Sequence, residues 1–455
     1  MRTTLPGPGG LPFVGVLFDF LRDPLGWLTE AHSRYGDTFA YRVGPFEVVQ
    51  LHHPADIEAV LVKEAGKAKK DVTTRDLARV IGDGLLTGEG DHWRKNRRLL
   101  APLLTRPRIS RYAGTFVTAT RLHADRLRAR EQAEVSSVFM ELAFDIVTEA
   151  LFGGAGSNKT GTGARSVGQQ IAHDVETLMR EYSRTIQSWP ALLPEWVPIP
   201  GRRRFEAAVR RLHRVTDQLV LEATPRSESR EDLVSRLVDA RDEEGRPMSP
   251  GGVRDEALTM LLAGHETTAL ALTYAAWVLA HDPALQDRVA AELASTLGGA
   301  DPTFADLERL PLTAAVFHET LRLYSPAWLI GREVVEPFAL PSSGVVLPVG
   351  VQVFLPQWAV HRDPRWWPDP LRFRPERFLE PDAARPRFAY FPFGGGPRVC
   401  IGIHFAEAEG VLALATLLQR LRFAPAPGAG QRALEFAPSI TLRPRAPVVL
   451  RISRR

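Results

Sequence analysis

Apolar residues recur at intervals of three and four along most of the chain, the spacing that places them on one face of an α-helix. In the first half of the sequence this spacing predicts helices at residues 93–104, 111–130, 135–152, 167–186, 203–224 and 230–242. In the second half it predicts helices at residues 257–280, 284–297, 312–324 and 402–421. The pattern therefore indicates a mainly helical protein.

Short runs rich in β-branched and aromatic residues interrupt the helical pattern. Residues 39–43 and 46–51 flank the turn-forming pair Gly44-Pro45 and are predicted to be two strands of a small sheet. Further strands are predicted at residues 345–347 and 351–355, and residues 437–452 are predicted to form a terminal hairpin.

The run of apolar residues at 257–280 is long enough to cross a bilayer. His265, Glu266, Thr267 and Thr268 stand at its centre, however, and polar groups there would be costly in lipid. We therefore predict a long helix buried inside a soluble protein. The apolar stretch at 11–18 is too short to span a membrane and lacks a cleavage signature, so no export or anchoring segment is expected there.

Composition and charge narrow the function only slightly. The 455 residues are 44% hydrophobic and 24% charged, as in ordinary globular proteins. The basic residues comprise 51 arginines and six lysines against 53 acidic residues. Arginine recognises carboxylates and phosphates, but the charges are scattered and no nucleic-acid recognition motif accompanies them, so a nucleic-acid partner is not expected.

The chain has one cysteine, Cys400, which excludes an internal disulfide and any metal site built from several thiolates. A lone cysteine is most often a small buried hydrophobic residue. Here it follows Gly394, Gly395 and Gly396, which let the backbone turn tightly and aim N–H groups at a sulfur. The predicted helix at 402–421 would add a favourable dipole. Both features favour a thiolate that ligates a metal.

The sequence from residue 393 to residue 402 resembles the haem-binding signature of the cytochrome P450 family. The matching positions are Phe393, Gly396, Arg398, Cys400 and Gly402, followed downstream by Phe405, Ala406 and Glu409. The resemblance implies that Cys400 is the axial ligand of haem b (iron protoporphyrin IX). It also implies that Phe393 packs beside the sulfur and that Arg398 pairs with a haem propionate.

A second motif, at residues 263–268, resembles the oxygen-activation motif of the same family. Glu266 and Thr267 place an acid beside an alcohol in an apolar helix, and together they could pass protons from solvent to a bound dioxygen. Gly264 is expected to permit close approach to haem and a local opening of the helix. The alternative is structural, since threonine can bond to the carbonyl four residues earlier and a buried glutamate can be a satisfied core group.

Glu319 and Arg322 lie three residues apart on a predicted helix and can interact with one another. Taken alone, such a pair is usually a surface ion pair. The family resemblance joins it to Arg377 in the later motif at residues 373–378. The trio is then expected to pin the proline-rich stretch at 362–397, which contains eight prolines and lacks a helical period.

Weaker matches complete the predicted site. Trp93 and Arg97, one helical turn apart, resemble a second propionate-binding pair, and Arg332 fits a third propionate position. By family position, the substrate pocket is expected to include Leu85, Leu86, Ala263, Trp328, Leu329, Ile330 and Ile440. Several of these could equally be core residues. Their apolar character favours a hydrophobic substrate.

The resemblance implies a single cytochrome P450 domain over residues 1–455, mainly α with small β-sheets (α+β). In this fold a triangular helical body holds haem between the long buried helix and the cysteine loop. Residues 1–10 form a Pro- and Gly-rich lead, and no fused reductase domain is expected.

The expected function is a monooxygenase that inserts one oxygen atom of dioxygen into a hydrophobic molecule. Electrons would come from a separate ferredoxin or flavodoxin with its reductase, docked on a basic patch that includes Arg94, Lys95 and Arg98. The single cysteine fits a reducing cytoplasm. Two alternatives stay open: a peroxide-driven oxygenase, and a haem-binding or sensing protein without turnover.

Overall fold

The computed structural model describes residues 5–153, 178, 202–223, 232–380, 383–428 and 433–455. The chain separates into two compact units. The first comprises residues Met1–Asp76, Leu310–Ile403 and Ala433–Arg445, and the second comprises Leu77–Arg309, His404–Arg432 and Ala446–Arg455. The helix predicted at 167–186 lies outside the described residues except for Leu178, which is helical.

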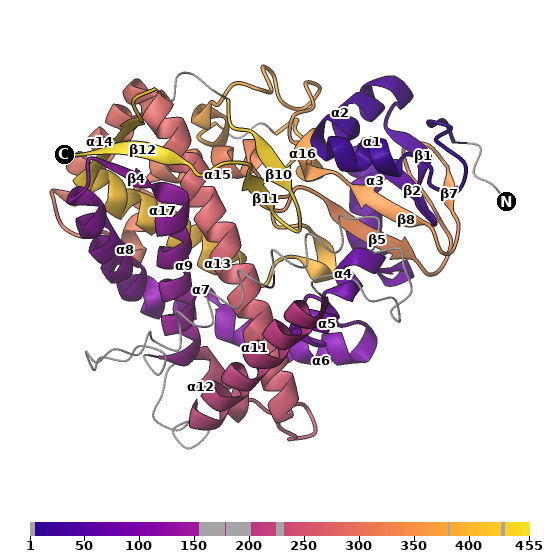
Figure 1. Ribbon diagram of the computed structural model, residues 1–455, viewed down its shortest axis with the longest axis horizontal. Helices are drawn as coiled ribbons and strands as arrows, with labels where there is room; N and C mark the ends of the chain where they lie inside the picture. Colours follow the sequence, from indigo (N-terminus) through magenta and orange to yellow (C-terminus); the bar gives the residue numbers. More distant parts are fainter. Residues whose placement is uncertain (1–4, 154–177, 179–201, 224–231, 381–382, 429–432) are drawn as a thin grey trace. The chain divides into compact units, whose positions relative to one another are not determined.

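The first unit is built on a five-stranded sheet of order β1-β2-β8-β5-β3. Its strands are β1 (Thr38–Val43), β2 (Phe46–Leu51), β3 (Ala68–Lys70), β5 (Ile330–Val334) and β8 (Gln352–Leu355). β1 and β2 form the predicted antiparallel pair, and β2 then pairs in parallel with β8. Strands from opposite ends of the sequence therefore lie side by side, as their indigo and orange colours show in Figure 1.

Helices and two short strand pairs complete the first unit. The helices are α1 (Leu17–Arg22), α2 (Pro24–Tyr35), α3 (Pro54–Glu58), α4 (Val72–Asp76), α15 (Pro311–Leu323) and α16 (Gln357–Val360). The strand pairs are β6 (Phe338–Ala339) with β7 (Val346–Leu347), and β10 (Phe436–Pro438) with β11 (Leu442–Pro444). A buried apolar cluster that includes Val49, Leu61, Val353 and Phe388 fastens the sheet to the residues on either side of it.

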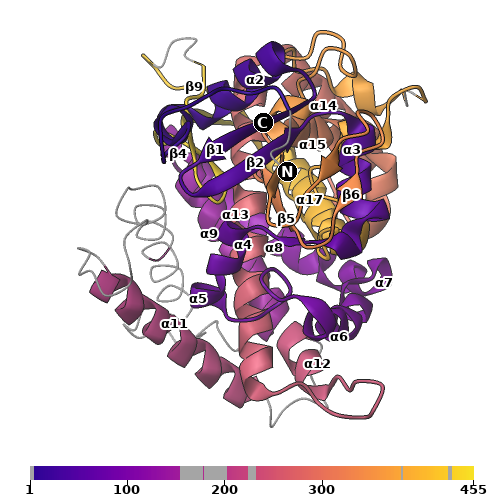
Figure 2. The ribbon, with the colours of Figure 1, turned by 90° about the vertical axis from the view of Figure 1, so that its right-hand side faces the viewer.

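The second unit is mainly helical. Its helices are α5 (Ala78–Ile81), α6 (Gly90–Leu100), α7 (Arg106–Ile109), α8 (Ala113–Arg128), α9 (Val135–Phe152), α11 (Arg202–Ala223), α12 (Leu233–Asp239), α13 (Pro250–His281), α14 (Pro283–Leu297) and α17 (Ile403–Arg420). A three-stranded sheet of order β4-β12-β9 consists of β4 (Gln132–Glu134), β9 (Leu421–Pro425) and β12 (Val449–Arg454). α13 packs along α9 and also contacts α11, as Figure 2 shows.

The helix predicted at 257–280 forms all of α13 except its first two turns and its last residue, and most of its side chains are buried. Ser249 caps the start of α13 by accepting a hydrogen bond from the Gly252 N–H, and Pro250 occupies the first turn, where a missing N–H costs nothing. The helix ends at Asp282, whose side chain caps α14. No helix in the described part of the chain is both long and apolar enough to cross a membrane.

The prediction of a terminal hairpin at 437–452 is wrong beyond residue 444. β10 and β11 do form a short hairpin, but β12 pairs with β4 and β9 in the other unit. The residues of β12 alternate as a strand should, but the partner strand β4 lies some three hundred residues earlier. A local sequence pattern cannot identify so distant a partner.

Candidate active site

The first unit presents Cys400 at the end of a compact loop. The thiol is exposed and makes no disulfide. The Cys400 N–H donates to the Phe393 carbonyl at 2.9 Å, and the Val399 N–H donates to the Gly396 carbonyl at 3.1 Å. These bonds close the loop on itself, so the sulfur is held at its surface.

The glycines of this loop are required by close packing. Gly394 and Gly396 have φ values of +72° and +65°, which other residues rarely adopt. A Cβ on Gly396 would lie 1.8 Å from the Leu61 carbonyl oxygen, and one on Gly395 would lie 2.4 Å from the Phe388 ring. The loop is therefore pressed against buried residues of its own unit and can keep its shape only with glycine at these positions.

The residues of the cysteine loop, and two arginines of the same unit, fit an iron–porphyrin group with a thiolate ligand. Cys400 offers an exposed donor, and α17 begins three residues later with the end of its dipole that favours an anion. Arg398 is half-buried in the turn that precedes the cysteine. Arg332 is buried in β5 and donates to the carbonyl of Gly331. Both cations belong to the same unit as the cysteine.

The predicted charged network is present in the first unit. Arg322 and Glu319 are fully buried on α15 and form a two-point ion pair, with Arg322 Nη2 2.7 Å from Glu319 Oε1 and Nε 2.8 Å from Oε2. Arg377 Nε lies 3.4 Å from Glu319 Oε1. The structure thus brings the three residues together.

The network also holds the backbone of the proline-rich stretch. Arg322 Nη1 donates to the carbonyls of His361 and Pro370 at 2.7 and 2.8 Å. Glu319 Oε1 accepts a hydrogen bond from the Arg374 N–H at 2.9 Å. A stretch without regular secondary structure has few partners for its carbonyl groups, and a buried guanidinium with five donors can satisfy several of them.

The second unit carries the acid and alcohol pair on α13. Glu266 is buried, whereas Met260, Ala263, Gly264 and Thr267 form an accessible stripe in the middle of the helix. The spacing of these residues places them on one face. Thr267 Oγ1 donates to the Ala263 carbonyl at 2.7 Å, so the hydroxyl lies on the accessible face.

The expected local opening of the helix at Gly264 is not present. α13 is regular from Pro250 to His281. A Cβ on Gly264 would lie 3.1 Å from Val147 Cγ2, so the glycine lets α13 approach α9 closely. Packing between the two helices therefore explains the glycine without any break in the helical hydrogen bonds.

A buried carboxyl group next to this motif received no role in the sequence analysis. Thr268 Oγ1 donates to Glu409 Oε2 at 3.2 Å, and both side chains are buried. Burial raises the pKa of Glu409 to about 8, and the hydrogen bond from Thr268 only partly offsets this effect. The sequence signal was present, since Glu409 stands in a helix that is otherwise largely apolar.

Trp93 and Arg97, the predicted propionate pair, lie one turn apart on α6, where Trp93 is buried and Arg97 half-buried.

The three cations of the predicted basic patch each contact an acid. Arg94 lies 2.7 Å from Asp91, Lys95 lies 2.6 Å from Asp242, and Arg98 lies 2.6 Å from Glu243. The patch therefore carries less unbalanced charge than its sequence suggests.

The predicted substrate-pocket residues fall in both units. Leu85, Leu86 and Ala263 belong to the second unit, and the others belong to the first. Trp328 is buried in an apolar cluster with Leu25, Leu28 and Leu442, and Leu329 packs against it. Ile330 begins β5, and Ile440 lies in the turn between β10 and β11.

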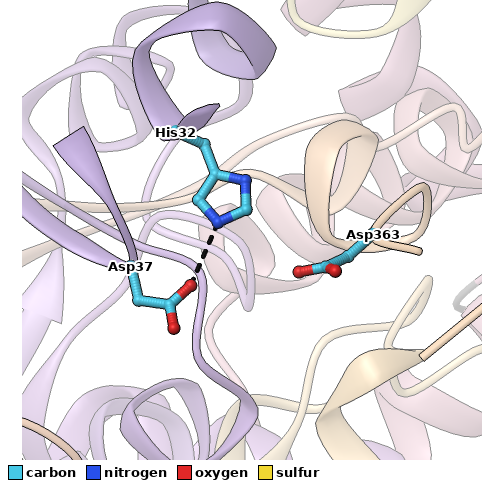
Figure 3. Close-up of side chains that lie close together, drawn as sticks. All are labelled: His32, Asp37 and Asp363. Atoms are coloured by element: carbon cyan, nitrogen blue, oxygen red, sulfur yellow. Dashed lines mark hydrogen bonds and ion pairs between the residues drawn. The ribbon is translucent and has the colours of Figure 1, made fainter. Parts of the chain in front are cut away.

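A separate cluster in the first unit could also hold a cation. Possible ligand atoms of His32, Asp37 and Asp363 lie within 4.8 Å of one another, and Figure 3 shows the His32 ring directed at Asp37. Arg365 Nη2 lies 2.6 Å from a carboxylate oxygen of each aspartate. Burial raises the pKa of Asp37, but hydrogen bonds from Arg365 and His32 outweigh it and hold that pKa well below its usual range. The cluster is an ion-pair network in which arginine supplies the cation.

Comparison with known proteins assigns the family. Residues 5–451 match the Cytochrome P450 family, and the chain therefore belongs to it. It is a P450 monooxygenase with a haem-thiolate cofactor, and such enzymes use dioxygen and a redox partner.

Three relatives from Streptomyces align over most of the chain. Cyclooctatin synthase of Streptomyces melanosporofaciens is 34% identical, over 92% of this chain and 90% of its own length. Cyclooctat-9-en-7-ol 5-monooxygenase of the same species is 32% identical, over 94% and 91%. Pentalenene oxygenase of Streptomyces avermitilis is 31% identical, over 94% and 93%.

Proposed function

We propose that the chain binds haem b through the Cys400 thiolate and inserts one oxygen atom of dioxygen into a C–H or C=C bond of a hydrophobic substrate. The observation that carries this proposal is the exposure of the only cysteine by a loop that excludes side chains at Gly395 and Gly396. When bound, the haem supplies the iron at which dioxygen is cleaved, a reaction that a thiolate ligand promotes.

Several residues of the chain would hold the cofactor. Arg398, Arg332, Trp93 and Arg97 would bind the propionates, because guanidinium and indole N–H groups donate well to carboxylates. Phe393, Gly396 and Gly402 would keep the loop in the shape that presents the sulfur.

Glu266 and Thr267 would supply protons. Thr267 Oγ1 lies on the accessible stripe of α13, where it can turn from the Ala263 carbonyl toward a bound molecule and donate its proton. Glu266, adjacent in sequence, would restore that proton from solvent. Gly264 and Ala263 have side chains small enough for a planar group to approach the backbone of α13.

The substrate would be a hydrophobic molecule with an unsaturated or alicyclic carbon skeleton. The names of two relatives denote an alkene, pentalenene, and an unsaturated alcohol, cyclooctat-9-en-7-ol. The residues proposed to border the substrate are Leu85, Leu86, Ala263, Trp328, Leu329, Ile330 and Ile440. They can bind such a skeleton through apolar contact.

Electrons would come from an acidic ferredoxin or flavodoxin with its reductase. Arg94, Lys95 and Arg98 remain the proposed contacts, although each now faces an acid of its own chain. A partner's carboxylates would have to displace those acids.

We place the protein in the cytoplasm, because a lone cysteine suits a reducing compartment.

The proposal is tested with Cys400→Ser. Wild-type protein should bind one haem per chain and give the red-shifted ferrous–carbonyl band typical of a thiolate ligand, and the variant should lose that band. An unchanged band in the variant contradicts the proposal. Turnover with a reductase system but not with peroxide alone would exclude the peroxide-driven alternative. Absence of product and of oxygen consumption across hydrophobic substrates would favour a sensing role.

A further inference from the structure

A buried carboxylate on α13, about two turns before the oxygen-activation motif, contacts the segment that carries Leu85. Glu256 has no exposed surface. Its Oε2 accepts a hydrogen bond from the Leu85 N–H at 3.1 Å, and its Oε1 accepts one from Asn96 Nδ2 at 2.8 Å. Asn96 lies on α6 and is also buried. One side chain therefore ties together α13, α6 and the segment between α5 and α6.

The segment Gly82–Gly88 fits closely against the same part of α13. The Asp83 N–H donates to Asp255 Oδ2 at 3.0 Å. Gly82 has a φ of +72°, and a Cβ there would lie 2.1 Å from the Asp255 carboxylate. A Cβ on Gly84 would lie 2.4 Å from Thr259 Oγ1. Three consecutive residues thus lie against one face of the helix and fix the backbone immediately before Leu85.

The network continues from Glu256 to the surface. Asn96 Nδ2 lies 3.1 Å from His92 Nε2, which lies 2.9 Å from the Asp83 carbonyl oxygen. His92 is about half exposed. One ring nitrogen cannot accept from Asn96 and donate to Asp83 at the same time, so His92 makes one of these two bonds at a time. The hydrogen bonds of the network therefore hold the segment at Leu85 and, in one tautomer of His92, also at Asp83.

We propose that Glu256 is a positioning residue that holds the segment Gly82–Gly88 against α13 and thereby sets where Leu85 and Leu86 border the substrate. The proposal rests on the proposed function, in which these two leucines line the substrate site. It assigns Glu256 no contact with the substrate or with the reacting atoms. Its effect is on the shape of the site.

The charge of Glu256 matters to this role. Burial raises the pKa of Glu256 to about 7, and the hydrogen bonds from Leu85 and Asn96 only partly offset the effect. The charged groups that face it are His92, which lowers the pKa, and Asp255, which raises it. The ionised carboxylate accepts both hydrogen bonds strongly, whereas the protonated form loses acceptor strength. The segment should therefore be held more firmly above pH 7 than below it.

Two probes that bind haem iron from the substrate side test the shape of the site. Imidazole is small, and 4-phenylimidazole carries a ring that must fit among the substrate-lining residues. In the haem-loaded enzyme, Glu256→Leu should change the ratio of the two dissociation constants by about tenfold, the equivalent of one hydrogen bond to a charged group. Glu409→Gln, a change at another buried carboxyl of this unit, is the matched control and should leave the ratio unaltered.

Hydrogen exchange at the Leu85 amide tests the contact itself. Its protection factor should fall at least tenfold in Glu256→Leu and stay at the wild-type value in Glu409→Gln. In the wild type, protection should rise between pH 6 and pH 8 beyond the intrinsic rate change. Glu256→Gln keeps the shape of the side chain and removes its charge, so it should abolish this rise in Leu85 protection with pH. If Glu256→Leu fails to fold, Glu256→Gln alone tests the proposal.

The proposal is overturned if a haem-loaded Glu256→Leu enzyme keeps both the wild-type probe ratio and the wild-type protection at Leu85. It is also overturned if Glu256→Gln retains the full pH dependence of that protection. The proposed function fails in a different way, through the absence of a thiolate-type carbonyl band in the wild type. Failure of the Glu256 proposal therefore cannot be mistaken for failure of the proposed function.

Discussion

The hydroxyl of Thr267 is the group on α13 with the clearest proposed part in oxygen chemistry. Because it bonds to the carbonyl four residues earlier, its removal leaves the backbone hydrogen bonds of the helix intact. Thr267→Ala should therefore keep its stability within about 0.5 kcal/mol of wild type. It should still consume dioxygen, but a larger share should appear as hydrogen peroxide and less as oxygenated product. The measurement is product and peroxide formed per dioxygen consumed.

Thr273 provides a matched control for that variant. Its hydroxyl donates to the Ala269 carbonyl at 2.7 Å, the same bond on the same helix, but the side chain is buried. Thr273→Ala should couple oxygen consumption to product as well as the wild type does. Equal coupling in both variants would remove the proton role from Thr267.

Glu409 makes a prediction about pH and stability. Its pKa is raised from the ordinary 4.5 to about 8 in the folded protein, so between these values the folded state binds more protons than the unfolded state. The free energy of unfolding should therefore fall as pH rises through this window, by up to about 1.4 kcal/mol per pH unit from this group. Below pH 4.5 the contribution is fully present.

Glu409→Gln removes the titration while it keeps the shape of the side chain. Urea unfolding at pH 5.5 and pH 7.5 should show a steeper loss of stability with pH in the wild type than in the variant. The comparison cancels the other titrating groups, which both proteins share. Parallel pH profiles would show that burial does not shift this carboxyl.

At the scale of elements, α15 depends on its buried ion pair to hold the proline-rich stretch. Arg322→Leu removes the two-point ion pair of the buried Glu319, which keeps only the longer contact with Arg377 and the Arg374 N–H, and it leaves the carbonyls of His361 and Pro370 without this donor. Removing one partner of a buried pair costs about 3–5 kcal/mol. We expect a comparable loss in chemical denaturation, together with lower haem retention, because the stretch leads into the cysteine loop.

Arg309 is the control, since it also pairs with an acid three residues away but is largely exposed. Its Nη1 lies 2.8 Å from Asp306 Oδ1. Arg309→Leu should cost less than about 1 kcal/mol, because the guanidinium is largely exposed to water even though Asp306 is buried. If both arginine variants lose stability equally, the burial of the α15 pair has no special importance.

Elements with a continuous apolar face could be predicted well from the sequence. The predicted helix at 135–152 coincides with α9, because one side of it is buried along its whole length. Elements fixed by distant partners could not. β12 was misplaced because its hydrogen bonds go to β4 and β9, and α2 was not predicted because Gly26 and several polar residues weaken its apolar pattern.

The candidate site was predictable where its chemistry is local. The cysteine loop and the acid and alcohol pair are each contained within ten residues, so their spacing alone carries the signal. The contacts of Glu256 were not predictable, because its partners Leu85 and Asn96 lie about 160 to 170 residues earlier. In the sequence, Glu256 follows Arg254 and Asp255 near the start of a helix, and nothing local distinguishes it from a solvent-exposed acid.

At the scale of the whole molecule, the proposed docking of an acidic electron donor depends on surface charge. Arg98 on α6 is exposed and paired with Glu243, which is also exposed. Arg98→Glu should slow reduction by an acidic ferredoxin several-fold at low salt, and Glu243→Gln should speed it, since it frees the arginine. Stopped-flow reduction rates at several ionic strengths measure both effects. Equal rates in all three proteins would place the docking surface elsewhere.

The exposure of a single sulfur has a practical consequence. A chromogenic disulfide reagent should react with the Cys400 thiol of cofactor-free protein and release one equivalent of coloured thiolate per chain. It should release none from molecules in which the thiolate is bound to haem iron. The fraction of chains that does not react then gives the fraction that contains haem, independently of the haem absorbance. Denaturant calibrates the count, since every unfolded chain must release one equivalent.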